Sequence, residues 1–242
     1  MIWITGMWDN WDPTGGQVRG VERQKDETHP FLSRSKVSNT LNEPEMYDFV
    51  DISNNNAQDG EVHYRSALFV RERIRKSGMI RPINNVKVYG GTIYEAWTKA
   101  WAGSFKDGEE RFWRNLFAGH ASIRFHRPPS GIGLNPVAQQ HIKSMRMLTD
   151  SLDLFRHVPF TSLLSAREPN EAFCLAIPGE EYALYFPAAG EVEIDIAAGL
   201  YVLRWLHIRS SVWRNAKTTE NLQTISTPDN DQWVVWIRRR RG

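Results

Sequence analysis

The spacing of apolar segments changes near residue 165, and this change constrains the fold more than any other feature of the 242-residue sequence. Before it, strand-like segments alternate with helix-like segments. After it, short strand-like segments follow one another about ten residues apart. Alternation is typical of a parallel sheet covered by helices, whereas closely spaced short strands are typical of an antiparallel sandwich. The sequence therefore predicts an α/β part followed by an all-β part, with the boundary near residues 158–168.

The α/β part combines strand-like and helix-like segments, each with recognisable end signals. Strands are predicted at Ile2–Trp8, Tyr47–Asn54, Ile83–Tyr89 and Ala121–His126. A first helix is predicted over Glu61–Lys76. Asp107 as a capping residue, with Glu110 three residues on, predicts the start of a second helix, which ends at Gly119. Asn135 as a cap and Pro136 as the first helical residue predict a third.

The all-β part contains short strands separated by turns such as Pro178-Gly179. Their apolar segments are 172–177, 182–186, 192–196, 201–208, 213–216, 222–226 and 232–237. An antiparallel β-sandwich of about 75 residues would accommodate them. The predicted domains are therefore 1–160 and 165–242. We expect Trp205, together with either Trp233 or Trp236, in the core of the sandwich.

Composition and motifs exclude several classes of protein. With 41% apolar and 24% charged residues, the chain is an ordinary globular protein rather than a disordered one. No apolar run approaches the roughly 20 residues of a transmembrane helix, and the first residues do not read as a signal peptide. The formal net charge of +2 gives no electrostatic reason to expect nucleic acid as a partner. Metal-binding spacings and nucleotide-binding motifs are missing, so we expect no metal and no cofactor. The compartment stays open.

Polar residues occupy alternate positions in three of the predicted parallel strands. Parallel strands that are covered on both faces are apolar throughout, so this alternation needs another explanation. It predicts one face packed beneath the three helices and one polar face turned toward the interior of a barrel. A sheet face exposed to solvent would give the same pattern. The apolar set comprises Val50, Ile52, Val86, Val88, Ile123 and Phe125, and the polar set comprises Asp51, Lys87, Tyr89, Arg124 and His126.

Candidate site residues come from the polar set and from the loops at the carboxyl ends of the strands, where barrel active sites lie. Aromatic side chains among carboxylates and amides suit a carbohydrate, which has apolar ring faces and hydroxyl edges. The substrate-binding candidates are Trp8, Trp11, Asp12, Asn55, Lys87, Tyr89, Trp97, Arg124, His126 and Arg127. The catalytic candidates are Asp9, Asp51 and Glu95. A small amphipathic helix on the barrel would also explain Tyr94, Trp97 and Trp101.

Several segments together resemble a known family. Residues 81–90, 107–119 and 124–131 resemble the C-terminal half of an apiosidase-like (β/α)8-barrel glycoside hydrolase family of bacterial, carbohydrate-active proteins. Residues 170–175, 181–187, 204–205 and 231–235 resemble a β-sandwich of the collagen-binding type that follows such barrels. The resemblance implies a partial (β/α)8, TIM-like barrel of about four strand–helix units and a small antiparallel β-sandwich. It also implies a plant or microbial glycan as ligand.

The sequence departs from this family where catalysis is concerned. The resemblance places an acid/base carboxylate after the fourth barrel strand, in the half that this sequence does not contain. It places a nucleophilic Glu at the end of the seventh strand, where this chain has Lys87 and Tyr89. Glycoside hydrolysis ordinarily takes two carboxyl groups. Three interpretations therefore stay open: a glycoside hydrolase once completed by the missing half, a non-catalytic carbohydrate- or protein-binding module, and an inactive truncation of a larger glycosidase.

The edges of such a half barrel predict self-association. Four adjacent parallel strands leave two unpaired edges, and unpaired edges recruit another chain. The segment 13–42 is polar, with few large apolar residues to cover an edge. A second copy of the chain or a partner that supplies the missing units could cover the edges. We therefore expect a homo-oligomer through the open sheet edges, or else poor solubility.

Overall fold

The computed structural model describes residues 44–52, 60–91, 102–128 and 130–240. The chain divides into two compact units, Met1–Gly133 and Leu134–Gly242. The predicted strand Ile2–Trp8 lies outside the described residues. The division falls before the third predicted helix, whereas the sequence placed the change of architecture near 158–168.

The first unit contains a parallel sheet with strand order β1-β2-β3. Each strand neighbours the next one in the chain, and a helix connects each pair, as in a (β/α) barrel. The described elements are η2 (Pro44–Met46), β1 (Val50–Asp51), α2 (Gly60–Lys76), β2 (Ile83–Val88), α4 (Phe105–Phe117) and β3 (Ser122–Phe125). These confirm the predicted strands and helices between residues 47 and 126, with shorter strands than expected.

Helix α4 begins at a capping box one turn earlier than predicted. Ser104 is the capping residue, and its hydroxyl accepts a hydrogen bond from the Asp107 amide at 3.3 Å. Asp107 accepts in return from the Ser104 amide at 2.6 Å. The sequence assigned Asp107 as the cap because Asp107 and Glu110 have the same three-residue spacing. Gly119, with a φ of +80°, follows the helix end as predicted.

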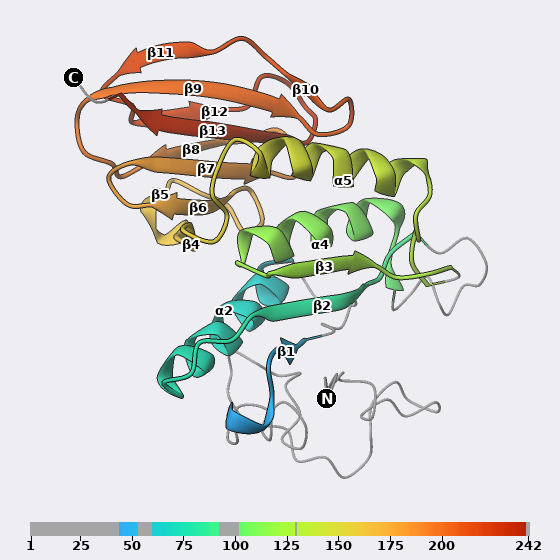
Figure 1. The fold of residues 1–242 in the computed structure, drawn as a ribbon. Coiled ribbons are helices and arrows are strands. Elements are labelled where there is room, and N and C mark those ends of the chain that lie inside the picture. The colour runs from blue at the N-terminus through green and yellow to red at the C-terminus, as the bar shows by residue number, and fades with distance from the viewer. Residues whose placement is uncertain (1–43, 53–59, 92–101, 129, 241–242) are drawn as a thin grey trace. The chain divides into compact units, whose positions relative to one another are not determined.

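Apolar residues of the helices and strands form the core of this unit. Helix α4 contacts β2 and β3, and α2 contacts α4 (Figure 1). The Phe112 ring of α4 stacks on Phe125 of β3, with ring centroids 4.5 Å apart. Val50 and Ile52 are fully buried, as expected for the helix-facing side.

Strand β2 departs from the predicted alternation because it contains a bulge. Asn85 pairs with Ile123, but Val88 pairs with Phe125, so β2 has one extra residue between the two pairs. The buried positions are consequently Ile83, Asn85 and Val88, and Val86 is half-buried. The prediction that Val86 is buried with Val88 is wrong for this reason.

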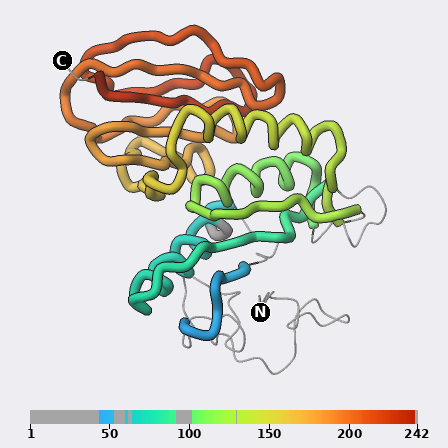
Figure 2. The backbone as a smooth tube through the Cα atoms, viewed as in Figure 1, coloured from blue at the N-terminus to red at the C-terminus, as the bar shows by residue number. Residues whose placement is uncertain are grey.

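The second unit consists of a helix, two antiparallel sheets and connecting turns. One sheet has the order β10-β9-β13-β7-β6-β4, with β11 also paired to β9, and the other has the order β12-β8-β5. The backbone trace in Figure 2 follows these strands from gold through orange to red. The elements are α5 (Pro136–Thr149), β4 (Val158–Pro159), η3 (Thr161–Leu163), β5 (Leu164–Ser165), β6 (Phe173–Ile177), β7 (Glu181–Phe186), β8 (Glu191–Ile194), β9 (Leu200–His207), β10 (Val212–Trp213), β11 (Lys217–Glu220), β12 (Thr224–Ser226) and β13 (Trp233–Arg239).

Both sheets contribute to one apolar core. Leu184 and Val235 from the larger sheet belong to the same buried cluster as Val192 and Ile225 from the smaller one. Trp205 is partly buried against this cluster.

Helix α5 belongs to the second unit, although the sequence placed it on the parallel sheet. Asn135 is its cap, as predicted, and accepts from the Ala138 amide at 2.8 Å. The helix contacts β9, and the Ser144 hydroxyl donates to the Ile208 carbonyl at 2.5 Å. The amphipathic pattern correctly predicted a buried face on α5 but could not show which sheet that face covers.

Candidate functional site

Six of the predicted site residues lie at or just beyond the carboxyl ends of the parallel strands. We call this group the strand-end cluster; it comprises Asp51, Lys87, Tyr89, Arg124, His126 and Arg127. The other predicted residues, Trp8, Asp9, Trp11, Asp12, Asn55, Glu95 and Trp97, lie outside the described residues. Asp51 is therefore the one predicted catalytic carboxylate whose position the structure gives.

Strand register brings the members of the cluster on β2 and β3 side by side. Val88 and Phe125 are partners across these parallel strands. Arg124, one residue earlier on β3, lies opposite the bulge that contains Val86 and Lys87, and its charge acts on Lys87. Tyr89 lies next to His126, one residue later, and their ring centroids are 4.7 Å apart.

Close backbone contacts fix the end of β2. Gly90 has a φ of +133°, and a Cβ on Gly90 would collide with the backbone nitrogen of Gly108 in α4. The strand end can therefore pack directly on the first turn of α4 because both positions are glycine. The buried Arg111 guanidinium adds a further tie, since its Nη1 donates to the Tyr89 carbonyl at 3.2 Å.

The loop after β3 is held by main-chain hydrogen bonds. The His126 amide donates to the Val88 carbonyl at 2.8 Å, and the Gly133 amide donates to the His126 carbonyl at 2.8 Å. The Gly90 amide donates to the Ser130 carbonyl at 3.1 Å. A Cβ on Gly131 would collide with the His126 carbonyl oxygen. The cluster thus rests on a backbone frame whose shape requires glycine at two places.

Asp51 is a buried member of the cluster. It is 1% exposed, and its Oδ1 accepts from the Val86 amide at 3.4 Å, which ties β1 to the bulge of β2. The pKa of Lys87 is lowered to about 8, mainly by burial and also by Arg124 and Arg127, while Asp51 acts in the opposite direction. Lys87 therefore remains mostly protonated at neutral pH, with a minor neutral fraction.

His126 is neutral at neutral pH. Burial lowers its pKa to about 4, and the cations Lys87, Arg127 and Arg124 add to this effect. Its Nδ1 lies 2.9 Å from the Ser130 hydroxyl. Ser130 was not predicted as a site residue, although it lies in the loop that the sequence assigned to the site. A neutral imidazole beside a hydroxyl supplies a donor and an acceptor for a polar ligand.

The chemistry of the described cluster suits binding better than hydrolysis. It offers cationic donors, a neutral imidazole and the buried Tyr89, whose pKa is raised by burial. Asp51 is covered, so it does not present a carboxyl group to a bond at the surface. Within the described ranges, no group of three or more His, Cys, Asp or Glu side chains is placed to hold a metal ion. In the same part of the chain, no helix is both long and apolar enough to cross a membrane.

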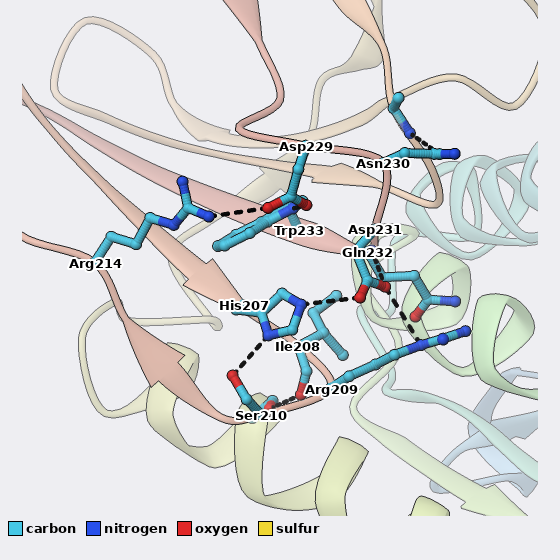
Figure 3. Close-up of polar contacts among 12 residues, drawn as sticks. His207, Ile208, Arg209, Ser210, Arg214, Asp229, Asn230, Asp231, Gln232 and Trp233 are labelled. Atoms are coloured by element: carbon cyan, nitrogen blue, oxygen red, sulfur yellow. Dashed lines mark hydrogen bonds and ion pairs between the residues drawn. The ribbon is translucent and has the colours of Figure 1, made fainter.

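A second polar cluster lies in the other unit, where β9 ends and β13 begins (Figure 3). We call it the Trp233 corner; it comprises His207, Ser210, Arg214, Asp229, Asp231 and Trp233. Asp229 accepts from the Trp233 Nε1 at 2.8 Å and pairs with Arg214 at 2.9 Å. The Arg214 guanidinium also lies over the Trp233 ring, 4.3 Å from its centroid.

The histidine in this corner links a hydroxyl to a carboxylate. His207 Nδ1 lies 2.6 Å from the Ser210 hydroxyl, and its Nε2 lies 3.0 Å from Asp231 Oδ2. Burial alone would raise the pKa of Asp231, but hydrogen bonds from the Gln232 amide and from His207, together with Arg209, hold it below its usual value. Because groups that follow β9 bond to groups that precede β13, the Trp233 corner is a structural brace between two loops.

Comparison with known proteins identifies the fold. No protein-family model and no curated protein sequence matches this chain. Among solved structures, a glycoside hydrolase family 5 protein from Bacteroides vulgatus superposes with a TM-score of 0.63 at 13% sequence identity, over 82% of this chain and 51% of its own. A second glycoside hydrolase superposes with a TM-score of 0.60 at 13% identity, over 82% of this chain and 54% of its own.

The chain has a glycoside hydrolase-like fold. Its mixed α/β architecture is TIM-like, in agreement with the sequential order of the parallel strands. The chain spans about half the length of the structures that it matches. At 13% identity the likeness concerns the fold alone.

Proposed function

We propose that this chain is a glycoside hydrolase-like protein that binds a plant or microbial glycan at the strand-end cluster. The observation that carries the proposal is the position of the cluster at the carboxyl ends of parallel strands in a glycoside hydrolase-like fold. In TIM barrels, ligands bind at this end of the strands. The half-buried His126 provides a ring surface there, backed by the ring of the buried Tyr89, and Lys87, Arg124 and Arg127 provide donors for hydroxyl groups.

The proposed architecture is the second half of an apiosidase-like (β/α)8 barrel followed by an accessory β-sandwich. The sequential β1-β2-β3 order and the partial coverage of the matched structures support the barrel half. The core shared by two antiparallel sheets supports the sandwich. Strands β1 and β3 are the edges of the described parallel sheet, and we propose that another copy of the chain covers one of them.

Binding without hydrolysis is the second candidate function, and the burial of Asp51 favours it. Hydrolysis needs two carboxyl groups that both reach the glycosidic bond. Asp51 is 1% exposed, and the remaining catalytic candidates, Asp9 and Glu95, lie outside the described residues. We propose that hydrolysis requires the other half of a barrel, whereas binding does not.

Two assays on the full chain separate these functions. Binding to a panel of plant and microbial polysaccharides is measured by affinity electrophoresis, and release of sugar is measured with the same polysaccharides and with aryl glycosides. We expect retention by at least one polysaccharide and no sugar release. Release of sugar that is abolished in Asp51→Asn would replace the binding function with a catalytic one. Failure to bind any glycan would refute the proposed function.

A further inference from the structure

The strand-end cluster is dominated by positive charge. Arg124 and Arg127 both act electrostatically on Lys87, and among the described residues the carboxylate of Asp51 acts on it in the opposite direction. That carboxylate is buried and accepts a main-chain hydrogen bond, so a ligand at the surface meets the cations first. His126 adds no positive charge at neutral pH because its pKa lies at about 4.

Arg124 is anchored in a way that leaves one edge of its guanidinium available. Its Nε donates to the Val86 carbonyl of the neighbouring strand at 3.2 Å, which fixes the plane of the group. In the part of the chain that the structure describes, its Nη groups have no hydrogen-bond partner. Two parallel N–H donors on a fixed plane match the two oxygens of a carboxylate or of a sulfate.

Arg127 extends the same surface. It is exposed and lies three residues beyond Arg124, in the loop whose path is fixed by the contact between Gly131 and His126. The charges of Lys87, Arg124 and Arg127 all act on His126, so they converge on one place. Like charges held together repel one another, and a bound anion relieves that repulsion. Neutral sugars, which carry hydroxyl groups only, do not use this feature.

We propose that the strand-end cluster binds an anionic sugar residue, one that carries a carboxylate or a sulfate ester, through Arg124 and Arg127. Lys87 completes the positive field around the anion. This inference rests on the proposed glycan-binding function and names the chemical class of the glycan. A carboxylate and a sulfate ester share this chemistry, and the two pairs of oligosaccharides in the test distinguish them.

The test measures dissociation constants by calorimetry with four oligosaccharides of equal length. A uronic acid oligosaccharide is compared with its carboxyl-reduced counterpart, and a sulfated oligosaccharide with its desulfated counterpart. We expect one anionic member to bind at least tenfold more tightly than its neutral counterpart, as a charge-assisted bidentate contact would give. We also expect its affinity to fall as salt is raised, because salt screens charges at an exposed site.

Arg124→Gln and Arg127→Gln should each weaken binding of the anionic oligosaccharide by roughly 10-fold to 100-fold. Arg124→Lys keeps the positive charge but removes the pair of parallel N–H donors, and we expect an intermediate loss of affinity. Arg65→Gln is the matched control, since Arg65 is an exposed arginine on α2 and should leave binding unchanged. Circular dichroism checks that each variant is folded.

The outcomes separate this inference from the proposed function. Equal binding of the anionic and neutral members of both pairs would overturn the inference and leave glycan binding in place. An equal loss in Arg65→Gln and Arg124→Gln would also overturn it, because the effect would then reflect net charge alone. Binding of none of the four oligosaccharides, together with no retention in the polysaccharide panel, would overturn both.

Discussion

The two units of this protein differ in whether their clustered polar side chains bond to one another. In the Trp233 corner, Arg214, Asp229 and Trp233 bond to one another. In the strand-end cluster, Arg124 and Arg127 are exposed, and their positive charges act on Lys87 and His126. Polar side chains that form hydrogen bonds and ion pairs with one another stabilise a loop. Exposed side chains of like charge that lie close together favour the binding of an oppositely charged ligand. The comparison indicates a structural role for the corner and supports the binding role that we propose for the cluster.

The largest effect should come from Trp233→Ala in the structural corner. Trp233 is 2% exposed, contacts Trp205 edge-on at 6.1 Å and donates to Asp229. We expect the free energy of unfolding to fall by about 3–5 kcal/mol, as for other large-to-small core changes. Denaturant titration measures it. Trp205→Ala should lower the free energy of unfolding by less, because Trp205 is only partly buried. Equal and small losses in both variants would show that the corner is not a brace.

The next largest effect is a pH dependence of the free energy of unfolding, which arises in the first unit. His120 is 1% exposed, and burial lowers its pKa from 6.5 to about 4. Its Nδ1 bonds the Asn115 carbonyl at 2.8 Å. Between those pKa values the unfolded chain binds the proton and the folded chain does not, so stability falls as the pH falls from 6.5 toward 4.

Between pH 7 and pH 5, we expect His120 to account for a loss of about 2 kcal/mol in the free energy of unfolding. Hydrogen exchange at both pH values should locate the loss in α4 and β3 rather than in the strands of the second unit. In His120→Gln this part of the pH dependence should disappear. The same pH slope in the variant and in the parent protein would rule out His120 as its source.

Smaller and matched effects are expected from the two helix caps. Ser104→Ala removes the cap of α4, and Asn135→Ala removes the cap of α5. Each should lower the free energy of unfolding by about 1 kcal/mol. Hydrogen exchange should show local loss of protection in the first unit for Ser104→Ala and in the second for Asn135→Ala. A loss that spreads over both units in each variant would mean that the units do not open separately.

The smallest effects should come from two exposed arginines, one from each cluster. Arg214→Gln removes an ion pair with Asp229 and a contact with the Trp233 ring. It should lower the free energy of unfolding by about 1 kcal/mol. Arg124→Gln should change the free energy of unfolding by less than about 0.5 kcal/mol, as for most surface substitutions. Thermal melts of the two variants make the comparison. A larger loss for Arg124→Gln than for Arg214→Gln would reverse the roles assigned to the two clusters.

Secondary structure could be predicted well where the local chemistry is decisive. Asn135 and Pro136 marked the start of α5, and Gly119 marked the end of α4. The strands β4, β5 and β11 were missed because they are short or polar and exist only through pairing with other strands. The partner of α5 could not be predicted either, because an apolar face does not specify which sheet it covers.

The strand-end positions of the described candidate residues could be predicted, but their geometry could not, and their role stays a prediction. Alternation placed Asp51, Lys87, Arg124 and His126 at the carboxyl ends of the strands, where the charges of Lys87 and Arg124 act on His126. The bulge on β2 could not be read from the sequence, because it depends on the pairing of β2 with β3. The burial of Asp51 was also not predicted, since alternation does not show how deep a polar residue lies.

The meeting of Gly90 and Gly108 has a consequence for how this protein could be altered. The strand end and the helix touch through main-chain atoms. This contact does not involve the side chains of Lys87, Arg124 and Arg127, so exchanging these residues leaves it in place. A library randomised at these three positions should consist mostly of folded proteins that differ in ligand preference. A library randomised at Gly90 and Gly108 should consist mostly of proteins that do not fold.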